Sequence, residues 1–237
     1  LLLQFTNQIK GEFFYFYKET EMKRIYVVRH GQTYINRYNK MQGWCDTPLT
    51  EPGIEGAEKA GEALKDVPFD IALSSDLKRA SDTCEIIMKH NVNKDELQHL
   101  ASPFFREQFY GYFEGLDSEM AWRMIGGSHG YATRQELFAH ESIDTIKDWI
   151  KDADPYHDAE NAEEYWARLD KGFKLISQLD GAENILLVTH GFTIRSLWYR
   201  YGDNIPLVPG PRNASITIMT MSAKGEIKIP SWNKMHL

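Results

Sequence analysis

The chain has 237 residues, of which 42% are hydrophobic and 26% are charged, and its formal net charge is −7. This composition is typical of a globular protein, and it excludes an intrinsically disordered chain, a collagen and a small disulfide-stabilised scaffold. The negative charge disfavours a general nucleic-acid-binding protein and a protein that binds acidic membranes. Neither of the two cysteines, Cys45 and Cys84, lies in a CxxC or metal-binding motif, so we expect two free thiols.

The N-terminal segment differs from the rest of the chain. Residues 1–21 include the aromatic run 13–17, and a typical domain start follows at Met22. We therefore predict an N-terminal extension of unknown role over residues 1–21 and a single domain over residues 22–237. No apolar run reaches the roughly 18 residues of a membrane-spanning helix, and the N-terminus lacks the pattern of a signal peptide. We expect no contact with a membrane and a cytoplasmic location.

In the first half of the chain, short apolar runs alternate with helical patterns. Residues 24–28 form a β-branched run that predicts a buried strand. Thr50 marks the start of a helix that extends to about residue 66. A second strand is predicted over residues 69–73, and Asp76 is expected to cap the helix that follows. Residues 102–131 are rich in glycine and aromatic residues, and they predict an ordered loop region.

The second half of the chain repeats this alternation. Helical spacing predicts one helix over residues 137–150 and another over residues 166–176. A third buried strand is predicted over residues 185–189, with a helix directly after it. Residues 215–221 and 226–229 are expected to pair as a hairpin. Short buried strands that alternate with helices predict an α/β fold around a mainly parallel sheet.

Reactive side chains follow all three predicted strands. Arg29 and His30 come directly after the first strand, Ser75 and Arg79 follow the second, and His190 follows the third. Ligands of an open parallel sheet bind outside the carboxyl ends of its strands. We therefore expect these two arginines and two histidines to meet at one edge of the sheet.

This set of side chains predicts phosphoryl transfer. Arginine binds phosphate oxygens through paired hydrogen bonds, and a histidine can serve as nucleophile or proton carrier. The leaving oxygen needs a proton, and Glu107 in the glycine-rich region is the best candidate for the acid. The sequence has no HExxH, EF-hand, zinc-type, Walker or GxGxxG motif, which favours a covalent histidine over metal-activated water.

Five blocks of residues resemble the histidine phosphatase (phosphoglycerate mutase-like) superfamily, in the order in which the family has them. The resemblance extends over about residues 22–222, and it implies a three-layer α/β/α sandwich around a mainly parallel sheet. The blocks are Arg29-His30-Gly31-Gln32-Thr33 with Asn36 and Gln42 to Thr50; Ser74 to Ala80 with Thr83; Glu107 with Gly111 and Glu114-Gly115; Val188 to Gly191; and Asn213 to Ser215.

The resemblance also implies a role for each matching residue. His30 is the nucleophile that becomes phosphohistidine, and Glu107 donates a proton to the leaving group. Arg29, Arg79 and His190 hold the phosphoryl group. The residues implied or considered at the phosphate or substrate side are Thr33, Asn36, Gln42, Gly43, Gly191 and Phe192, of which Phe192 could equally be a core aromatic residue.

Members of this family divide into phosphoglycerate mutases, phosphatases and proteins that have lost catalysis. The mutase branch typically has a basic residue directly after the acid and a later Arg-Arg pair. Here Gln108 follows Glu107, and Arg123 and Arg134 stand singly. The aromatic residues within 109–113 are expected to form a rim that suits an apolar or variable leaving group.

The sequence therefore favours a metal-independent phosphomonoester hydrolase that acts on small phosphorylated metabolites and uses no cofactor. The alternative is a phosphoglycerate mutase that depends on 2,3-bisphosphoglycerate. A non-catalytic protein that binds phosphorylated ligands is the third hypothesis. The expected partner is a small phosphorylated substrate, and neither nucleic acid nor membrane; the sequence leaves the oligomeric state open.

Overall fold

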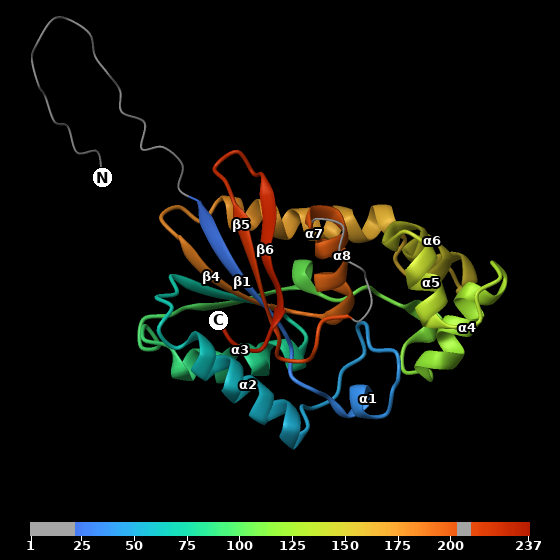
Figure 1. The fold of residues 1–237 in the computed structure, drawn as a ribbon, viewed down its shortest axis with the longest axis horizontal. Coiled ribbons are helices and arrows are strands. Elements are labelled where there is room, and N and C mark those ends of the chain that lie inside the picture. Colours follow the sequence, from blue (N-terminus) through green and yellow to red (C-terminus); the bar gives the residue numbers. More distant parts are fainter. Residues whose placement is uncertain (1–21, 203–209) are drawn as a thin grey trace, which may run out of the picture.

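The computed structural model describes residues 22–202 and 210–237, and its centre is a six-stranded sheet in the order β3-β2-β4-β1-β5-β6 (Figure 1). The first four strands in this order pair in parallel, whereas β5 pairs antiparallel with β1 and β6 with β5. The mainly parallel sheet is thus confirmed. The strands are β1 (Lys23–Arg29), β2 (Ile71–Ser75), β3 (His99–Ser102), β4 (Asn184–Thr189), β5 (Ile216–Met221) and β6 (Ile227–Lys234).

Helices cover both faces of the sheet, which confirms the three-layer arrangement. Helices α2 and α3 lie on one face, α7 and α8 lie on the other, and α4 to α6 gather beyond one end of the sheet (Figure 1). The helices are α1 (Tyr34–Arg37), α2 (Glu51–Leu64), α3 (Lys78–His90), α4 (Ser118–Gly127), α5 (Arg134–His140), α6 (Ile143–Ala153), α7 (Ala162–Ser177) and α8 (Gly191–Tyr201), with two 3-10 turns, η1 (Pro103–Phe105) and η2 (Gly111–Phe113).

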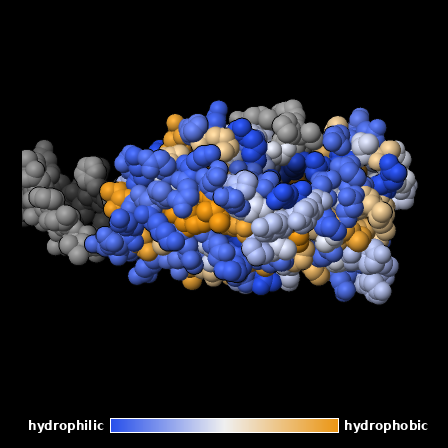
Figure 2. Space-filling view, turned by 90° about the horizontal axis from the view of Figure 1, so that it is seen from below, coloured by the Kyte–Doolittle hydropathy of each residue, from blue (hydrophilic) through white to orange (hydrophobic). Residues whose placement is uncertain are grey.

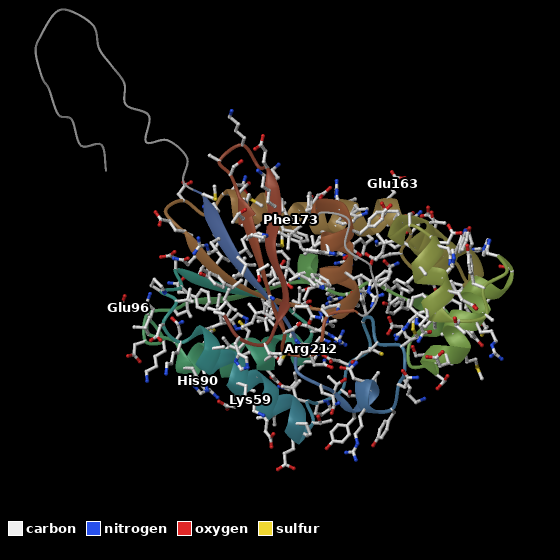
Figure 3. The ribbon with its side chains drawn as sticks, viewed as in Figure 1. Lys59, His90, Glu96, Glu163, Phe173 and Arg212 are labelled. Carbon is white, nitrogen blue, oxygen red and sulfur yellow. The ribbon has the colours of Figure 1, made fainter. Side chains whose placement is uncertain are left out.

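Strand β1 shows why the predicted strands are apolar throughout. Ile25 and Val27 belong to the core shared with α7 and α8, whereas Tyr26 and Val28 belong to the core shared with α2 and α3. Successive side chains of a strand point to opposite faces, so a strand covered on both sides has no polar alternation. Along α7, Phe173 points toward the sheet and Glu163 points away from it (Figure 3).

The register between β1 and β4 determines where the reactive residues lie. These two strands pair in parallel from Arg24 opposite Asn184 to Arg29 opposite Thr189. The residue directly after each strand is a histidine, His30 after β1 and His190 after β4, and the register therefore places both at the same edge of the sheet. A third core, formed by α4, α5 and α6 with Tyr110 and Phe192, packs beyond this edge.

The sequence analysis missed α4 and β3, as well as the short helix α1 and the two 3-10 turns. Residues 102–131 are not one loop region, because α4 lies within them; its last two residues are glycines, which hid the helical pattern. Strand β3 was not predicted, because it is an edge strand of four residues with only one buried position, Ser102. It therefore lacks a continuous apolar run.

Two predicted helix boundaries were wrong. The single helix predicted over residues 137–150 is two helices, because Ser142 interrupts it and caps α6 by accepting a hydrogen bond from the Thr145 amide at 3.0 Å. Asp76 does not cap α3, whose N-cap is Leu77 without a side-chain hydrogen bond. The Asp76 carboxylate pairs instead with Arg106 at 2.6 Å.

The surface seen in Figure 2 is mostly hydrophilic, with hydrophobic residues in a few separate areas. Among residues 22–202 and 210–237, no helix is long and apolar enough to cross a membrane. Cys45 and Cys84 are both free thiols, as expected. The predicted extension over residues 1–21 lies outside the described residues.

A single carboxylate, that of Glu114, joins two loops at the carboxyl edge of the sheet. One loop follows α1 and the other connects β3 to α4. Both oxygens of Glu114 accept backbone hydrogen bonds, from the amides of Gly43 (3.0 Å), Trp44 (2.8 Å), Cys45 (3.1 Å) and Tyr110 (3.1 Å). A carboxylate can accept all four, because both of its oxygens are acceptors.

We predict that Glu114→Gln lowers the free energy of unfolding by about 1–3 kcal/mol, because the new amide group would face backbone donors that then lack an acceptor. Urea denaturation of both proteins measures the difference. Glu85→Gln, at an exposed position of α3, is the matched control and should change little. An equal effect of the two substitutions would contradict this role of Glu114.

Candidate active site

His30 is buried and lies directly after β1. Its Nδ1 is 2.7 Å from the carbonyl oxygen of Gly31, which can only accept, so Nδ1 carries the proton and Nε2 keeps a lone pair. The Nε–H of Arg79 donates to this Nε2 at 3.3 Å. Burial, and then the charges of Arg79 and Arg29, hold the pKa of His30 well below its usual value. The ring is therefore neutral, and Nε2 has the lone pair that a nucleophile needs.

Arg79 is fully buried at the start of α3, although a helix position of this kind would ordinarily be solvated. Its guanidinium donates to the carbonyl oxygens of Gly43 at 2.6 Å and Cys45 at 2.9 Å, and to Asp46 Oδ1 at 3.1 Å. Asp46 is the only carboxylate among these partners, and the sequence analysis did not single it out. The planar guanidinium is held in one orientation, with Nε toward His30.

Thr83 connects α3 to the loop after β1. Its hydroxyl donates to the Arg79 carbonyl at 2.7 Å and accepts from the Gly31 amide at 3.0 Å. On the other side, the Asn213 side-chain amide donates to the His30 carbonyl at 3.0 Å and to Asn36 Oδ1 at 3.2 Å. The backbone on both sides of the His30 ring is thereby held by side chains from distant elements.

His190 and Arg29 complete the set of two histidines and two arginines predicted at this edge of the sheet. The rings of His30 and His190 are 5.2 Å apart between centroids. Within the described residues, neither ring nitrogen of His190 has a hydrogen-bond partner, and the same holds for Nε of Arg29. Burial lowers the pKa of His190 well below its usual value and that of Arg29 to about 10. Buried polar atoms without partners are costly, and a bound anion would satisfy them.

Glu107 reaches the same place from the loop after η1. Its carboxyl oxygens accept hydrogen bonds from the Phe192 amide at 2.8 Å, the Thr193 amide at 2.8 Å and the Thr193 hydroxyl at 2.9 Å. These amides begin α8, whose N-cap residue His190 provides no side-chain cap, so Glu107 caps the helix from outside. Burial raises the pKa of Glu107, and the hydrogen bonds from α8 oppose this effect.

A cavity of about 560 Å³ opens at this edge of the sheet. Thr33 and Gly43, both predicted at the substrate side, do not line it. Thr33 caps α1 and donates to Gln42 Oε1 at 2.7 Å, and the Gly43 carbonyl binds Arg79, so both hold other site residues in place. Arg79 and His190 are fully buried beside His30 and outside the lining. The predicted residues that do line the cavity are Arg29, His30, Asn36, Gln42, Glu107, Gly191 and Phe192.

The predicted aromatic rim over residues 109–113 is wrong, because only Tyr110 faces the cavity. Phe109 packs on the Trp44 ring at 4.9 Å, Phe113 is fully buried and Tyr112 is exposed. Gln108 is also fully buried and hydrogen-bonds to the Glu160 carbonyl. The aromatic walls come instead from α4, α5 and α8, through Trp122, Phe138 and Phe192.

The sequence analysis missed several cations that line the cavity. Arg195 is the most buried of them; its guanidinium carbon lies 4.4 Å from the Phe138 ring centroid, and no salt bridge is formed to it among the described residues. Burial, and then the charge of Arg134, lower its pKa to about 10. One sequence signal was available: Arg195 lies four residues after Gly191, on the same face of the helix. The cavity cations beyond Arg29 are Lys40, Arg134, Arg195 and Arg212.

Such a site suits an oxyanion. Its polar side chains are mainly donors, and guanidinium groups match the geometry of phosphate and carboxylate oxygens. Among residues 22–202 and 210–237, no three His, Cys, Asp or Glu side chains lie close enough together to hold a metal ion. We call the part of the lining formed by Lys40, Trp122, Arg134, Phe138 and Arg195 the far wall, and its cations can hold a second anionic group of the same ligand.

Comparison with known proteins gives consistent results. The sequence profile of the histidine phosphatase superfamily (branch 1) matches residues 25–234. A phosphoglycerate mutase of Schizosaccharomyces pombe is 29% identical over 174 residues, which are 72% of this chain and 75% of the relative. Fructose-2,6-bisphosphatase TIGAR B of Danio rerio is 30% identical over 181 residues, which are 71% of this chain and 70% of the relative.

Comparison of the fold with solved structures also finds a phosphoglycerate mutase. The crystal structure of phosphoglycerate mutase from Bacillus anthracis str. Sterne matches with a TM-score of 0.84 and 33% sequence identity, and the match covers 92% of this chain and 95% of that one. The relatives thus include both mutases and a phosphatase. Two histidines at the carboxyl edge of a mainly parallel sheet, together with these similarities, show that the chain belongs to the histidine phosphatase superfamily, branch 1, and is an enzyme that acts on phosphorylated metabolites.

Proposed function

We propose that this protein is a metal-independent phosphomonoester hydrolase that forms a phosphohistidine at His30. The observation that carries the proposal is the neutral His30 ring, with its lone pair at Nε2, among Arg29, Arg79 and His190. Guanidinium groups around a phosphoryl group neutralise its equatorial oxygens, and a covalent histidine replaces a metal-activated water as the nucleophile. The roles assigned to these residues by the family resemblance therefore fit their positions.

The reaction takes two steps. In the first, His30 Nε2 attacks the phosphorus in line, the bond from phosphorus to the leaving oxygen breaks, and Glu107 donates its proton to that oxygen. In the second, water attacks the phosphorus on His30, Glu107 accepts a proton from the water, and inorganic phosphate leaves as the ring is restored. Burial favours the protonated carboxyl that the first step requires, because it raises the pKa of Glu107.

The far wall of the cavity indicates the kind of substrate. A volume of about 560 Å³ suits a small molecule, and Arg195 with Arg134 and Lys40 favours one that has a second anionic group beside its phosphoryl group. We therefore propose a small phosphorylated metabolite with a carboxylate or a second phosphate. The cytoplasmic location remains a prediction from the sequence.

A phosphoglycerate mutase is the second candidate function, and the same cations favour it. A mutase must bind a carboxylate as well as two phosphate positions, and its cofactor 2,3-bisphosphoglycerate would need these cations at the far wall. The absence of an Arg-Arg pair counted against a mutase in the sequence; Arg134 and Arg195 supply two guanidiniums from different elements. Gln108, which is buried and turned away from the cavity, still differs from the basic residue of that branch.

We predict that acid-labile, alkali-stable phosphate accumulates on His30 when the enzyme is mixed with labelled substrate and quenched, and that His30→Ala abolishes both the label and turnover. His129→Ala, at an exposed position, is the control. With 3-phosphoglycerate, a hydrolase releases inorganic phosphate whether or not 2,3-bisphosphoglycerate is present. Formation of 2-phosphoglycerate that requires the bisphosphate would identify the mutase, and full activity of His30→Ala would exclude both.

We predict an acidic optimum for hydrolysis of an alkyl phosphate. Glu107 must be protonated, so the rate falls as the pH rises through its raised pKa, whereas His30 stays neutral in mild acid because its pKa is lowered. Glu107→Gln should reduce kcat by about 10²–10⁴-fold and remove this decline, because the amide does not titrate in this range. Profiles of kcat against pH test this, and an unchanged profile in the variant would contradict it.

We predict that Arg195→Met raises the KM of phosphoglycerate by about tenfold or more, because charge-assisted hydrogen bonds of about 1.5–3 kcal/mol are lost. The KM of p-nitrophenyl phosphate, which has no second anion, should stay nearly constant. Arg123→Met, at an exposed position of α4, is the matched control. Equal increases in the KM of both substrates would show that Arg195 does not bind a second anionic group.

A further inference from the structure

We propose that Arg168 and Glu160 are positioning residues that aim the carboxyl group of Glu107. The inference rests on the proposed role of Glu107 as the acid. Neither residue lines the cavity: Glu160 precedes α7, and Arg168 lies on its second turn. Their side chains form an ion pair that is only 13% exposed on each side.

Arg168 binds the backbone that leads to the acid. Its Nη1 donates to the carbonyl oxygens of Phe104 at 3.1 Å and Arg106 at 3.0 Å, with a longer contact of 3.4 Å to Pro103. Its Nη2 donates to the carbonyl oxygen of Glu107 itself at 3.0 Å. One guanidinium thus supplies donors to four carbonyl groups of the acid loop, which we define as residues 103–109.

Glu160 binds the backbone on the other side of the acid. Its carboxylate accepts from Arg168 Nε at 2.7 Å and Nη2 at 2.8 Å, and also from the Phe109 amide at 3.0 Å. The Glu160 amide donates in turn to the Phe109 carbonyl at 3.0 Å. Residues 106–110 belong to no helix or strand, so hydrogen bonds to other segments hold this part of the backbone in place.

The acid is consequently held between two helices. Its carboxyl group binds the first amides of α8, and its backbone is bound to the beginning of α7, which Leu169 and Phe173 anchor in the core beneath the sheet. Trp44 adds a second donor to the Glu107 carbonyl, through Nε1 at 3.0 Å. If the hydrogen bonds from Arg168 and Glu160 to the acid loop are lost, the carboxyl group should shift relative to the leaving oxygen. The phosphate-binding residues should stay in place, because other segments hold them.

The geometry requires an arginine. Only a planar guanidinium has enough donors, in a fixed arrangement, to bind several carbonyls and a carboxylate at once. A lysine would keep the charge but would reach one or two of these acceptors. The rate of phosphohistidine formation from an alkyl phosphate in Arg168→Lys should therefore lie between the rates of the unchanged enzyme and of Arg168→Met.

The test compares leaving groups, because a proton donor matters most when the leaving oxygen is strongly basic. We measure phosphohistidine formation from p-nitrophenyl phosphate, whose leaving group needs little protonation, and from an alkyl phosphate. Arg168→Met should slow the alkyl phosphate reaction by about tenfold or more, because a misplacement on the order of 1 Å is costly, and should slow the other by less than about threefold. Orthovanadate affinity should not change.

Two further variants separate positioning from folding. Trp44→Phe keeps the ion pair and removes one donor to the Glu107 carbonyl, so it should shift the leaving-group dependence in the same direction by a smaller factor. Arg200→Met breaks a surface ion pair between α8 and Asp170 of α7, and it should leave both reactions unchanged. Equal losses with both substrates in Arg168→Met, or a loss of vanadate binding, would overturn the inference in favour of a general structural role.

Glu107→Gln is measured in parallel to keep the two proposals distinguishable. If Glu107→Gln slows both substrates equally, the proposed acid role of Glu107 fails, and the positioning inference falls with it. If Glu107→Gln shows the leaving-group dependence and Arg168→Met does not, the acid role stands and only the inference about Arg168 and Glu160 is overturned.

Discussion

The structure depends on one constraint, which is that two guanidinium groups, that of the fully buried Arg79 and that of the half-buried Arg29, must stay beside a neutral histidine. Arg79 and Arg29 are bound largely by backbone carbonyls, those of Gly43, Cys45 and Pro211, and within the part of the chain that the structure describes Asp46 is the only carboxylate hydrogen-bonded to either. Carbonyl groups satisfy the donors without cancelling the positive charge. The charge therefore remains available to a phosphoryl group. Burial is the main cause that lowers the pKa of His30, and the charges of Arg79 and Arg29 lower it further, because they would repel a cationic ring.

Glu107 is the carboxyl group that lies near these positive charges. A carboxylate so close to the arginines could simply neutralise them, but its oxygens are bound by the first amides of α8 instead. Those bonds oppose burial in determining its pKa, so the group can both lose and regain a proton. Helix α8 thus has two functions: its first residues bind the carboxyl group of Glu107, and one turn later it places Arg195 in the cavity wall.

The reacting centre and the far wall of the cavity are built from different parts of the chain. Strand ends and α3 supply the proposed phosphate-binding residues, whereas α4, α5 and α8 supply Trp122, Phe138, Arg134 and Arg195. Solved structures of a protein named as a mutase and of one named as a phosphatase share this fold, so the fold alone does not distinguish the two activities. One fold can host several activities, and the activity depends on the residues of the site.

The sequence by itself determined the buried strands and the residues directly after them, because a β-branched run and the residue that follows it are local features; β1 with His30 and β4 with His190 are examples. The end of the second strand pointed to Arg79 and the glycine-rich region to Glu107, and the family resemblance then implied a role for each. Only the tertiary structure decided which side chains share the cavity. Arg134 and Arg195 look like isolated surface cations in the sequence, and the aromatic residues 109–113 look like a rim, yet the first two line the cavity and only Tyr110 of the rim does. Membership of a cavity depends on how distant helices pack, and no pattern within one segment encodes that.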